Sequence, residues 1–276
     1  MTAQQVRVAP PRAGRGLRIR RTLTLLIVLV ALAVGVDYAA AAITESAVSR
    51  EMREQTGLAD DPSVRINNFP FLAQAIAGRY KSVDVTAEHM TVGPLRDVQL
   101  RTQLRDVRAP LSQLLAGPRT LTVREAEGTV RIGAPDVERL LPGVDKLYID
   151  GIDAEGLERA VDDGADPALL QIDPATATRL GGTVDVLGEK QPVSVIAVLQ
   201  IADGQAQIVP RDVRLGDEEQ PPPAVQQRLS RLFTLRLDPG TLPLQVTPTR
   251  LRATSNGLEI SGLTGRLVLG GSTPTG

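Results

Sequence analysis

The sequence predicts an α+β protein that consists mainly of long antiparallel strands. Three observations support this fold class. Apolar and polar residues alternate over long stretches, which is the period of a strand with one buried face. Turn pairs such as Asp203-Gly204 and Asn256-Gly257 join neighbouring stretches as hairpins. Short apolar segments that begin at proline and end at glycine interrupt the strands as brief helices, and strands and helices of this kind pack in layers.

The composition narrows the classes of function. Of 276 residues, 42% are hydrophobic but only 2% are aromatic, and Trp and Cys are absent. So few rings disfavour the stacking of bases or sugars, and without Cys there is no thiolate nucleophile or Cys-ligated metal. Six arginines and no acid lie in residues 1–21, which leaves 25 basic against 32 acidic residues in the remainder, about −7. This acidic body does not suit nucleic acid.

The N-terminal residues have the pattern of an export segment. The basic lead, residues 1–21, precedes an apolar segment over residues 22–43, which is close to the length that spans the cytoplasmic membrane. Ala39-Ala40-Ala41 also satisfies the small-residue rule for cleavage. The sequence favours an uncut signal anchor over a cleaved signal, and Asp37 then has to lie near the outer interface. Either way the body lies in the periplasm or cell-wall space, or is secreted if the signal is cut.

A Phe-Pro-Phe corner comes after a predicted continuation of this helix over residues 43–57. Pro70 suits the first position of a short helix, and Gly78 suits its left-handed end. Leu72 and Ile76 stand four residues apart, so they share one side of this helix. Two interpretations remain open at this point. The corner either packs the first helix onto a sheet, or it places an apolar helix at the mouth of a cavity.

The rest of the body, residues 44–269, is predicted to form one domain, followed by a tail over residues 270–276. The alternation that includes Val83 and Val85 changes phase at Met90, which predicts a bulge near Glu88-His89. A strand over 193–201 is apolar on both faces and should be covered on both. The other predictions are strands over 95–107, 121–123, 128–133, 147–152, 206–208, 242–246 and 258–269, short helices over 111–115, 135–141 and 224–233, and a loop or frayed helix over 155–168.

The sequence contains none of the common catalytic patterns. His89 is the only histidine, whereas triads and His-ligated zinc sites need a histidine with a nucleophile or several histidines. Nucleophile elbows, phosphate-binding loops and dinucleotide fingerprints are absent from the sequence. Carboxylate groups at Asp60-Asp61, 162–166 and Glu218-Glu219 lie in turns, where acids are solvated caps. The sequence therefore predicts no catalytic residue, metal or cofactor.

One family resemblance is carried by the Phe-Pro-Phe corner and the strand after it. Asn68-Phe69-Pro70-Phe71-Leu72, Gly78-Arg79-Tyr80 and Val83-Asp84-Val85 resemble the actinobacterial LmeA-like family of phospholipid-binding envelope proteins. The resemblance covers about residues 40–269, and its other matching stretches are Glu127-Gly128-Thr129-Val130, the strand end over 210–213, Leu242-Pro243-Leu244 and Asn256-Gly257-Leu258. The chain departs from the family pattern at Ala73-Gln74-Ala75, where bulkier residues are expected.

The resemblance implies a membrane-associated, non-catalytic protein that binds phospholipids such as phosphatidylinositol. In mycobacterial members it also implies a link to mannan elongation in lipomannan and lipoarabinomannan, and hence envelope mannosyltransferases as partners. The implied fold is similar to the tubular lipid-binding superfamily, in which a long curved sheet wraps one or more helices and forms an apolar groove.

Our hypothesis from the sequence is that such a groove shelters acyl chains beside the short helix. Arg79 and Lys81 are candidates for contacting the phosphate head group, although surface salt bridges would explain them as well. The alternative is a non-catalytic scaffold with a solid core that recruits an envelope glycosyltransferase, and a carboxylate hydrolase is a third possibility. The expected lining of the groove is Phe69, Phe71, Leu72 and Ile76 on the helix side, and Val83, Val85, Met90, Val195, Ala197 and Leu199 on the sheet side.

Overall fold

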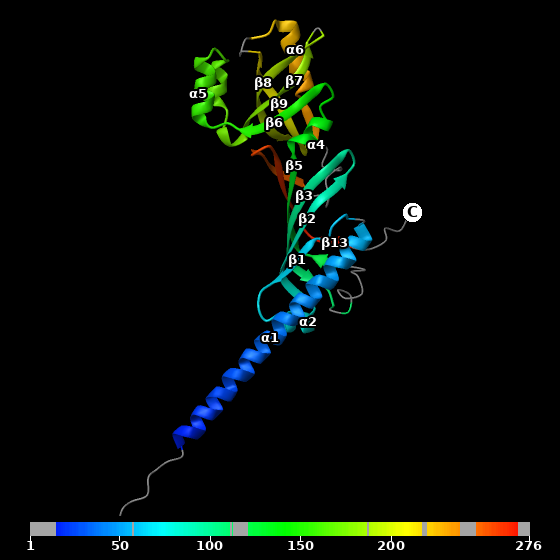
Figure 1. Ribbon diagram of the computed structural model, residues 1–276, viewed down its shortest axis with the longest axis vertical. Helices are drawn as coiled ribbons and strands as arrows, with labels where there is room; N and C mark the ends of the chain where they lie inside the picture. Colours follow the sequence, from blue (N-terminus) through cyan, green and yellow to red (C-terminus); the bar gives the residue numbers. More distant parts are fainter. Residues whose placement is uncertain are drawn as a thin grey trace, which may run out of the picture.

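The computed structural model describes residues 15–56, 58–110, 112, 121–186, 188–216, 220–237 and 247–269. The molecule is elongated, with helix α1 (Arg15–Thr56) at one end, an eight-stranded sheet in the middle and a five-stranded sheet at the other end (Figure 1). We call the five-stranded part the head. The predicted α+β class with antiparallel sheets is confirmed, but the strands form two sheets. The predicted helix over 111–115, apart from residue 112, the strand over 242–246 and the tail over 270–276 lie outside the described residues.

The eight-stranded sheet contains the predicted bulge and one of the predicted hairpins. The register shifts between Ala87 and Met90, and His89 has a φ of 53°, as expected for an extra residue that restores the alternation. Asn256-Gly257 joins the last two long strands. The strand order is β1 (Ser63–Asn67), β2 (Arg79–Val92), β3 (Leu95–Arg108), β5 (Glu125–Gly133), β12 (Gly257–Thr264) and β11 (Thr247–Thr254), with the short β4 (Leu121–Val123) and β13 (Leu267–Leu269) paired beside this path.

The head carries most of the short helices. Its strands follow the order β10 (Leu235–Leu237), β9 (Gln205–Leu215), β8 (Glu189–Ala202), β7 (Ala177–Val186) and β6 (Val144–Gly151). Its helices, with one at the junction of the sheets, are α4 (Ala134–Arg139), α5 (Ala154–Asp162), η1 (Pro167–Gln171), η2 (Pro174–Thr176) and α6 (Pro223–Leu232).

Helix α5 corrects the prediction of a loop or frayed helix over residues 155–168. The Asp153 carboxylate accepts a hydrogen bond of 2.8 Å from the Gly156 backbone N–H and so caps the helix. Leu157 is buried and packs with Leu169 and Ile196. The acidic, glycine-containing sequence did not predict this helix, because the stability of the helix comes from a cap and from contacts with η1 and β8.

Two main clusters of buried side chains form the core. The first fills the head and its junction with the middle sheet, and it includes Val195, Leu199 and Phe233. The second lies where α1 and β1 meet the ends of β2 and β3, and it includes Phe71 and Tyr80. Strand β8 is covered on both faces, as predicted, because Ile196 packs under α5 on the face opposite Val195.

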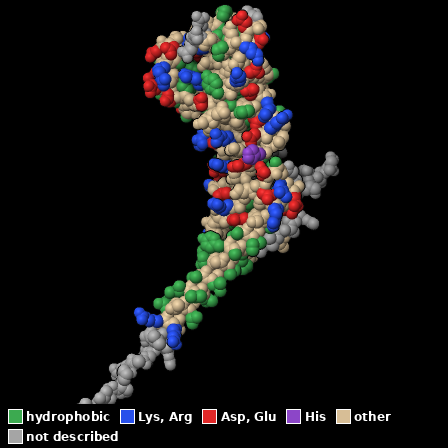
Figure 2. Space-filling view, in the orientation of Figure 1, with side chains coloured by type: hydrophobic (Ala, Val, Ile, Leu, Met, Phe, Trp, Pro, Cys, Tyr) green, Lys and Arg blue, Asp and Glu red, His purple; other side chains and the backbone are tan. Residues whose placement is uncertain are grey.

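Helix α1 has two parts with different surroundings. Its N-terminal part exposes apolar side chains, while its C-terminal part packs against β1 and α2 (Phe71–Ala77) through residues such as Val48. Among the described residues, one helical segment, Arg20–Glu54, is long and apolar enough to cross a membrane. Figure 2 shows apolar side chains coating the projecting part of α1, with Lys and Arg near its far end.

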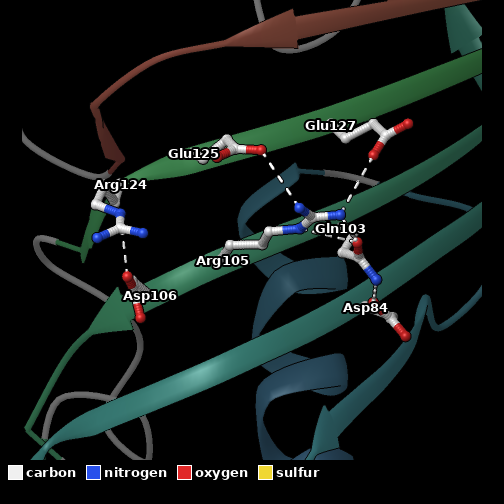
Figure 3. A network of polar contacts seen from close by, with 7 residues as sticks. All are labelled: Asp84, Gln103, Arg105, Asp106, Arg124, Glu125 and Glu127. Atoms are coloured by element: carbon white, nitrogen blue, oxygen red, sulfur yellow. Dashed lines mark hydrogen bonds and ion pairs between the residues drawn. The ribbon is translucent and has the colours of Figure 1, made fainter.

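The outer face of the middle sheet is polar. A ladder of contacts crosses β1, β2, β3 and β5, and in Figure 3 it stands on the face turned away from α1. The Asp84 carboxylate accepts hydrogen bonds from Asn67 Nδ2 (2.7 Å) and Gln103 Nε2 (3.3 Å), and Arg105 contacts Gln103 and two glutamates of β5. Such exposed pairs stabilise little, but they identify this face as solvent-facing. Apolar ligands are therefore expected on the opposite face or at the sheet ends.

Candidate functional site

A side chain of α1 fixes the short helix α2. Helix α2 begins after Pro70 and ends at Gly78, whose φ of 60° is the predicted left-handed end. Pro70 offers no capping side chain. Instead the Asp37 carboxylate accepts hydrogen bonds of 2.8 Å from the backbone N–H groups of Phe71 and Leu72. Asp37 is only 5% exposed, so a buried carboxylate 34 residues upstream caps α2 and holds it against α1.

The two sides of α2 differ from the sequence expectation. Phe71 and Ala75 form its buried side, and the Phe71 ring lies 6.3 Å from that of Tyr80. Leu72 and Ile76, which were expected to line the groove from the helix side, point outward and are 37% and 88% exposed. The four-residue spacing correctly predicted a stripe, but the side of the helix that faces the protein is the neighbouring one.

A cavity of about 400 Å³ lies between α2 and the ends of β2 and β3. Three cations line it, namely Arg79, Lys81 and Arg108, and we call it the cationic cavity. None of the three has an ion pair among the described residues. The one acid in the lining, Asp106, is held by Arg124 at 3.0 Å. The complete lining is Asn68, Phe69, Pro70, Ala73, Gln74, Ala77, Arg79, Tyr80, Lys81, Asp106, Val107 and Arg108.

The strand register makes this cluster of charge unusual. Arg79 of β2 lies directly opposite Arg108 of β3. Like charges at directly opposed positions destabilise a sheet. Two opposed guanidinium groups, with Lys81 beside them and no acid free to neutralise them within the lining, make a site suited to an anion.

The rest of the lining is mostly apolar and held in place by one glutamine. The Gln74 side chain donates from Nε2 to the backbone oxygen of Asn68 and accepts at Oε1 from the Lys81 backbone N–H, at 3.1 Å. Tyr80 is 1% exposed, and its hydroxyl is the one buried tyrosine oxygen without a hydrogen-bond partner among the described residues. Burial raises the pKa of Tyr80, so the hydroxyl keeps its proton.

Comparison with known proteins assigns the chain to a family. The model of the LmeA-like phospholipid-binding family matches residues 35–262. The chain belongs to this family. Comparisons with curated proteins and with solved structures gave no match. The matched range includes Asp37, α2 and every residue of the cationic cavity, and membership supports a lipid-binding role for this LmeA-like chain.

The structure divides the remaining predicted lining residues between two places. Phe69 lines the cationic cavity, and Val83 and Val85 belong to the nearby cluster under α1 and α2. Met90 packs against the head cluster. Val195, Ala197 and Leu199 lie on β8 within the head cluster, where all three are buried. The structure therefore does not bring the β8 residues together with α2.

The packing around β8 gives a first testable prediction. Ala197 is fully buried and lies between Thr178 and Pro210 on the flanking strands. Ala197→Leu is expected to lower the free energy of unfolding by roughly 1–3 kcal/mol, because a filled core has no room for the larger side chain. Thermal unfolding measures this, with Val198→Leu on the more exposed face as the control. An unchanged or higher Tm for Ala197→Leu would show that a cavity reaches β8.

A larger cavity of about 600 Å³ lies in the head, at the end of the molecule away from α1 (Figure 1). Charges of both signs line it, with Asp150 and Asp153 against Arg159 and Arg179. Asp153 is already used to cap α5. No cluster of His, Asp or Glu suited to a metal occurs among the described residues.

Proposed function

We propose that this LmeA-like protein binds the head group of an anionic phospholipid of the phosphatidylinositol type at the cationic cavity. It does so on the outer side of the cytoplasmic membrane and thereby supports the assembly of mannan-bearing lipoglycans. The observation that carries the proposal is the group of three cations, Arg79, Lys81 and Arg108, which lack ion pairs within the described chain and lie beside apolar walls. A phosphate between the two opposed arginines would replace their repulsion by paired, charge-assisted hydrogen bonds.

The size of the cavity limits how much of a lipid it holds. At about 400 Å³ it is near the lower end of small-molecule sites, which suits a phosphorylated polyol and the first methylene groups. Two complete acyl chains need more apolar space. On this proposal the chains stay in the outer leaflet beside α1 while the head group is bound.

The joint between α1 and α2 supports an uncut signal anchor. Cleavage at Ala39-Ala40-Ala41 would remove Asp37 and leave the N–H groups of Phe71 and Leu72 without their acceptor. The family match begins at residue 35, which is ahead of this cleavage site. On this proposal the anchor is retained as part of the folded domain, and the protein is a single-pass membrane protein with its body outside the cytoplasm.

The rival function is a non-catalytic scaffold that recruits an envelope mannosyltransferase without binding lipid. The filled head core around Val195 and Ala197 favours it, because this part of the molecule has packed side chains where the wall of an apolar groove was expected. In both functions the protein is not itself an enzyme. They differ in whether purified protein retains phospholipid.

Native mass spectrometry of the full-length chain separates the two functions. The protein, extracted in mild detergent, is offered phosphatidylinositol, phosphatidylglycerol and phosphatidylcholine at equal concentrations. We expect one anionic lipid to be retained, with phosphatidylinositol preferred and phosphatidylcholine excluded. Equal retention of phosphatidylglycerol would contradict the polyol specificity. If no lipid is retained and added phosphatidylinositol leaves the Tm unchanged, the scaffold is the correct function.

A further inference from the structure

Four apolar side chains are exposed around the joint between α1 and α2. Tyr38 on α1 is 65% exposed, and Phe69, Leu72 and Ile76 at α2 are 58%, 37% and 88% exposed. The Tyr38 and Phe69 rings stack with centroids 6.1 Å apart, which joins the two elements into one surface. We call these four residues the collar. Figure 2 shows that apolar side chains continue from the projecting part of α1 to the base of the domain.

The length of α1 places the collar relative to a membrane. The arginine pair Arg20 and Arg21 marks the inner end of the apolar segment. A hydrocarbon core about 30 Å thick takes roughly 20 helical residues, so a span that begins after Arg21 ends near Ala41. Asp37 then lies in the last turns before the outer boundary, and its hydrogen bonds bring the start of α2 to the same level.

We propose that the collar is seated in the outer-leaflet interface of the membrane that α1 spans. Exposed aromatic and aliphatic side chains are normal at this level, where Tyr and Phe combine with the apolar ends of a span. The Asp37 carboxylate is tolerated there because two backbone N–H groups donate hydrogen bonds to it within the protein. The remote end of the molecule lacks this continuity with the span.

The seating also explains the position of the cationic cavity. Phe69 belongs both to the collar and to the cavity lining, so the cavity lies at the level of the lipid head groups. Arg79, Lys81 and Arg108 would then face a surface rich in phosphate. A head group could enter the cavity without its acyl chains leaving the bilayer. The seating itself does not depend on whether the cavity holds a lipid.

Single-cysteine labelling tests this proposal in the full-length chain, which has no native cysteine. Ile76→Cys and Leu170→Cys place a fluorophore at two exposed apolar positions, the second in the head. The protein is reconstituted in vesicles of phosphatidylcholine and phosphatidylglycerol with or without brominated acyl chains. We expect the bromolipid to quench the label at position 76 several-fold more than the label at position 170, and aqueous iodide to show the reverse order.

Two results would overturn the seating. Equal iodide quenching at both positions would place the collar in water. Protection of position 76 from both quenchers would mean that a second copy or another protein covers it. A second variant, Ile76→Asp, is expected to raise iodide quenching of a label at position 72 without changing the Tm in detergent. A third result is that bromolipid quenches the label at position 76 while the protein retains no phospholipid in native mass spectrometry. That result would support the seating of the collar and contradict the proposed function.

Discussion

Asp37→Ala is expected to release α2 from α1 and to lower the free energy of unfolding by roughly 2–4 kcal/mol, because the buried N–H group of Phe71 and the partly buried N–H group of Leu72 lose their acceptor. Hydrogen exchange on the full-length protein in nanodiscs measures the effect locally. Exchange at the backbone amides of Phe71 and Leu72 should accelerate strongly, and phospholipid retention should fall because the cavity wall is no longer held.

Glu54→Ala is the matched control for this variant. Glu54 is an exposed acid on the same helix, so its removal should leave exchange at Phe71 and Leu72 unchanged. Asp37→Asn keeps one carbonyl oxygen and should fall between the wild type and Asp37→Ala. If Asp37→Ala exchanges like the wild type at both amides, the carboxylate does not hold α2, and the support for a retained anchor is lost with it.

Arg108→Glu is expected to reduce phospholipid retention by tenfold or more while leaving the protein as stable as before, or more stable. The opposed Arg79–Arg108 pair becomes an attractive pair, which contributes about 0.2–1 kcal/mol in favour of folding. The same charge reversal takes away one cation from the anion and adds a repulsive carboxylate. A rise in Tm together with a loss of binding is typical of a substitution that removes a destabilising feature needed for function, which here is the repulsion between the two arginines.

Arg101→Glu provides the comparison on the same strand. Arg101 is exposed on β3, outside the cavity, and its reversal should change neither the Tm nor lipid retention appreciably. Equal losses of binding in the two variants would indicate general attraction between the surface and anionic lipid. Unchanged binding in Arg108→Glu would remove the opposed arginines from the site.

Local signals were sufficient for much of the fold. Pro70 and Gly78 predicted the bounds of α2, the phase change before Met90 predicted the bulge, and Asp203-Gly204 predicted the β8–β9 hairpin. Each of these features is determined by residues close together in the chain. The α1 helix continues through residues 43–56 as predicted, and it begins at Arg15, within the basic lead.

The contacts that form the site are long-range, and most of them were not predicted. Asp37 was considered only as a costly charge in a membrane, because nothing in the local pattern indicates that it caps a helix 34 residues away. The exposure of Leu72 and Ile76 depends on which stripe of α2 meets Tyr80, and spacing alone does not determine this.

Arg108 is a residue that the sequence could have revealed. The turn at Gly93-Pro94 lies midway between Arg79 and Arg108, so counting outward from it along a regular hairpin pairs the two arginines. The predicted bulge near His89, taken alone, would shift this pairing by one residue. In the structure a second irregularity between Met90 and Val92 restores the register. Arg79 and Arg108 therefore pair as in a regular hairpin.

In the structure, the apolar part of α1 leads into a unit formed by the α1–α2 contact and the cationic cavity, and on our proposal this part of α1 spans the membrane. The head is packed and lies far from the span (Figure 1). This arrangement suits a protein that holds a phospholipid head group at the membrane surface and presents it to a partner. It differs from a carrier that encloses the whole lipid and moves through the aqueous space.

Photo-crosslinking in nanodiscs tests the central claim most directly. The full-length protein is illuminated with a phosphatidylinositol analogue that carries a diazirine close to the phosphate, and the adducts are located by peptide mass spectrometry. The account predicts adducts on residues 68–81 and 106–108, and their loss in Arg108→Glu but not in Arg101→Glu. Adducts on β8 in the head, or adducts confined to the projecting part of α1, would contradict it.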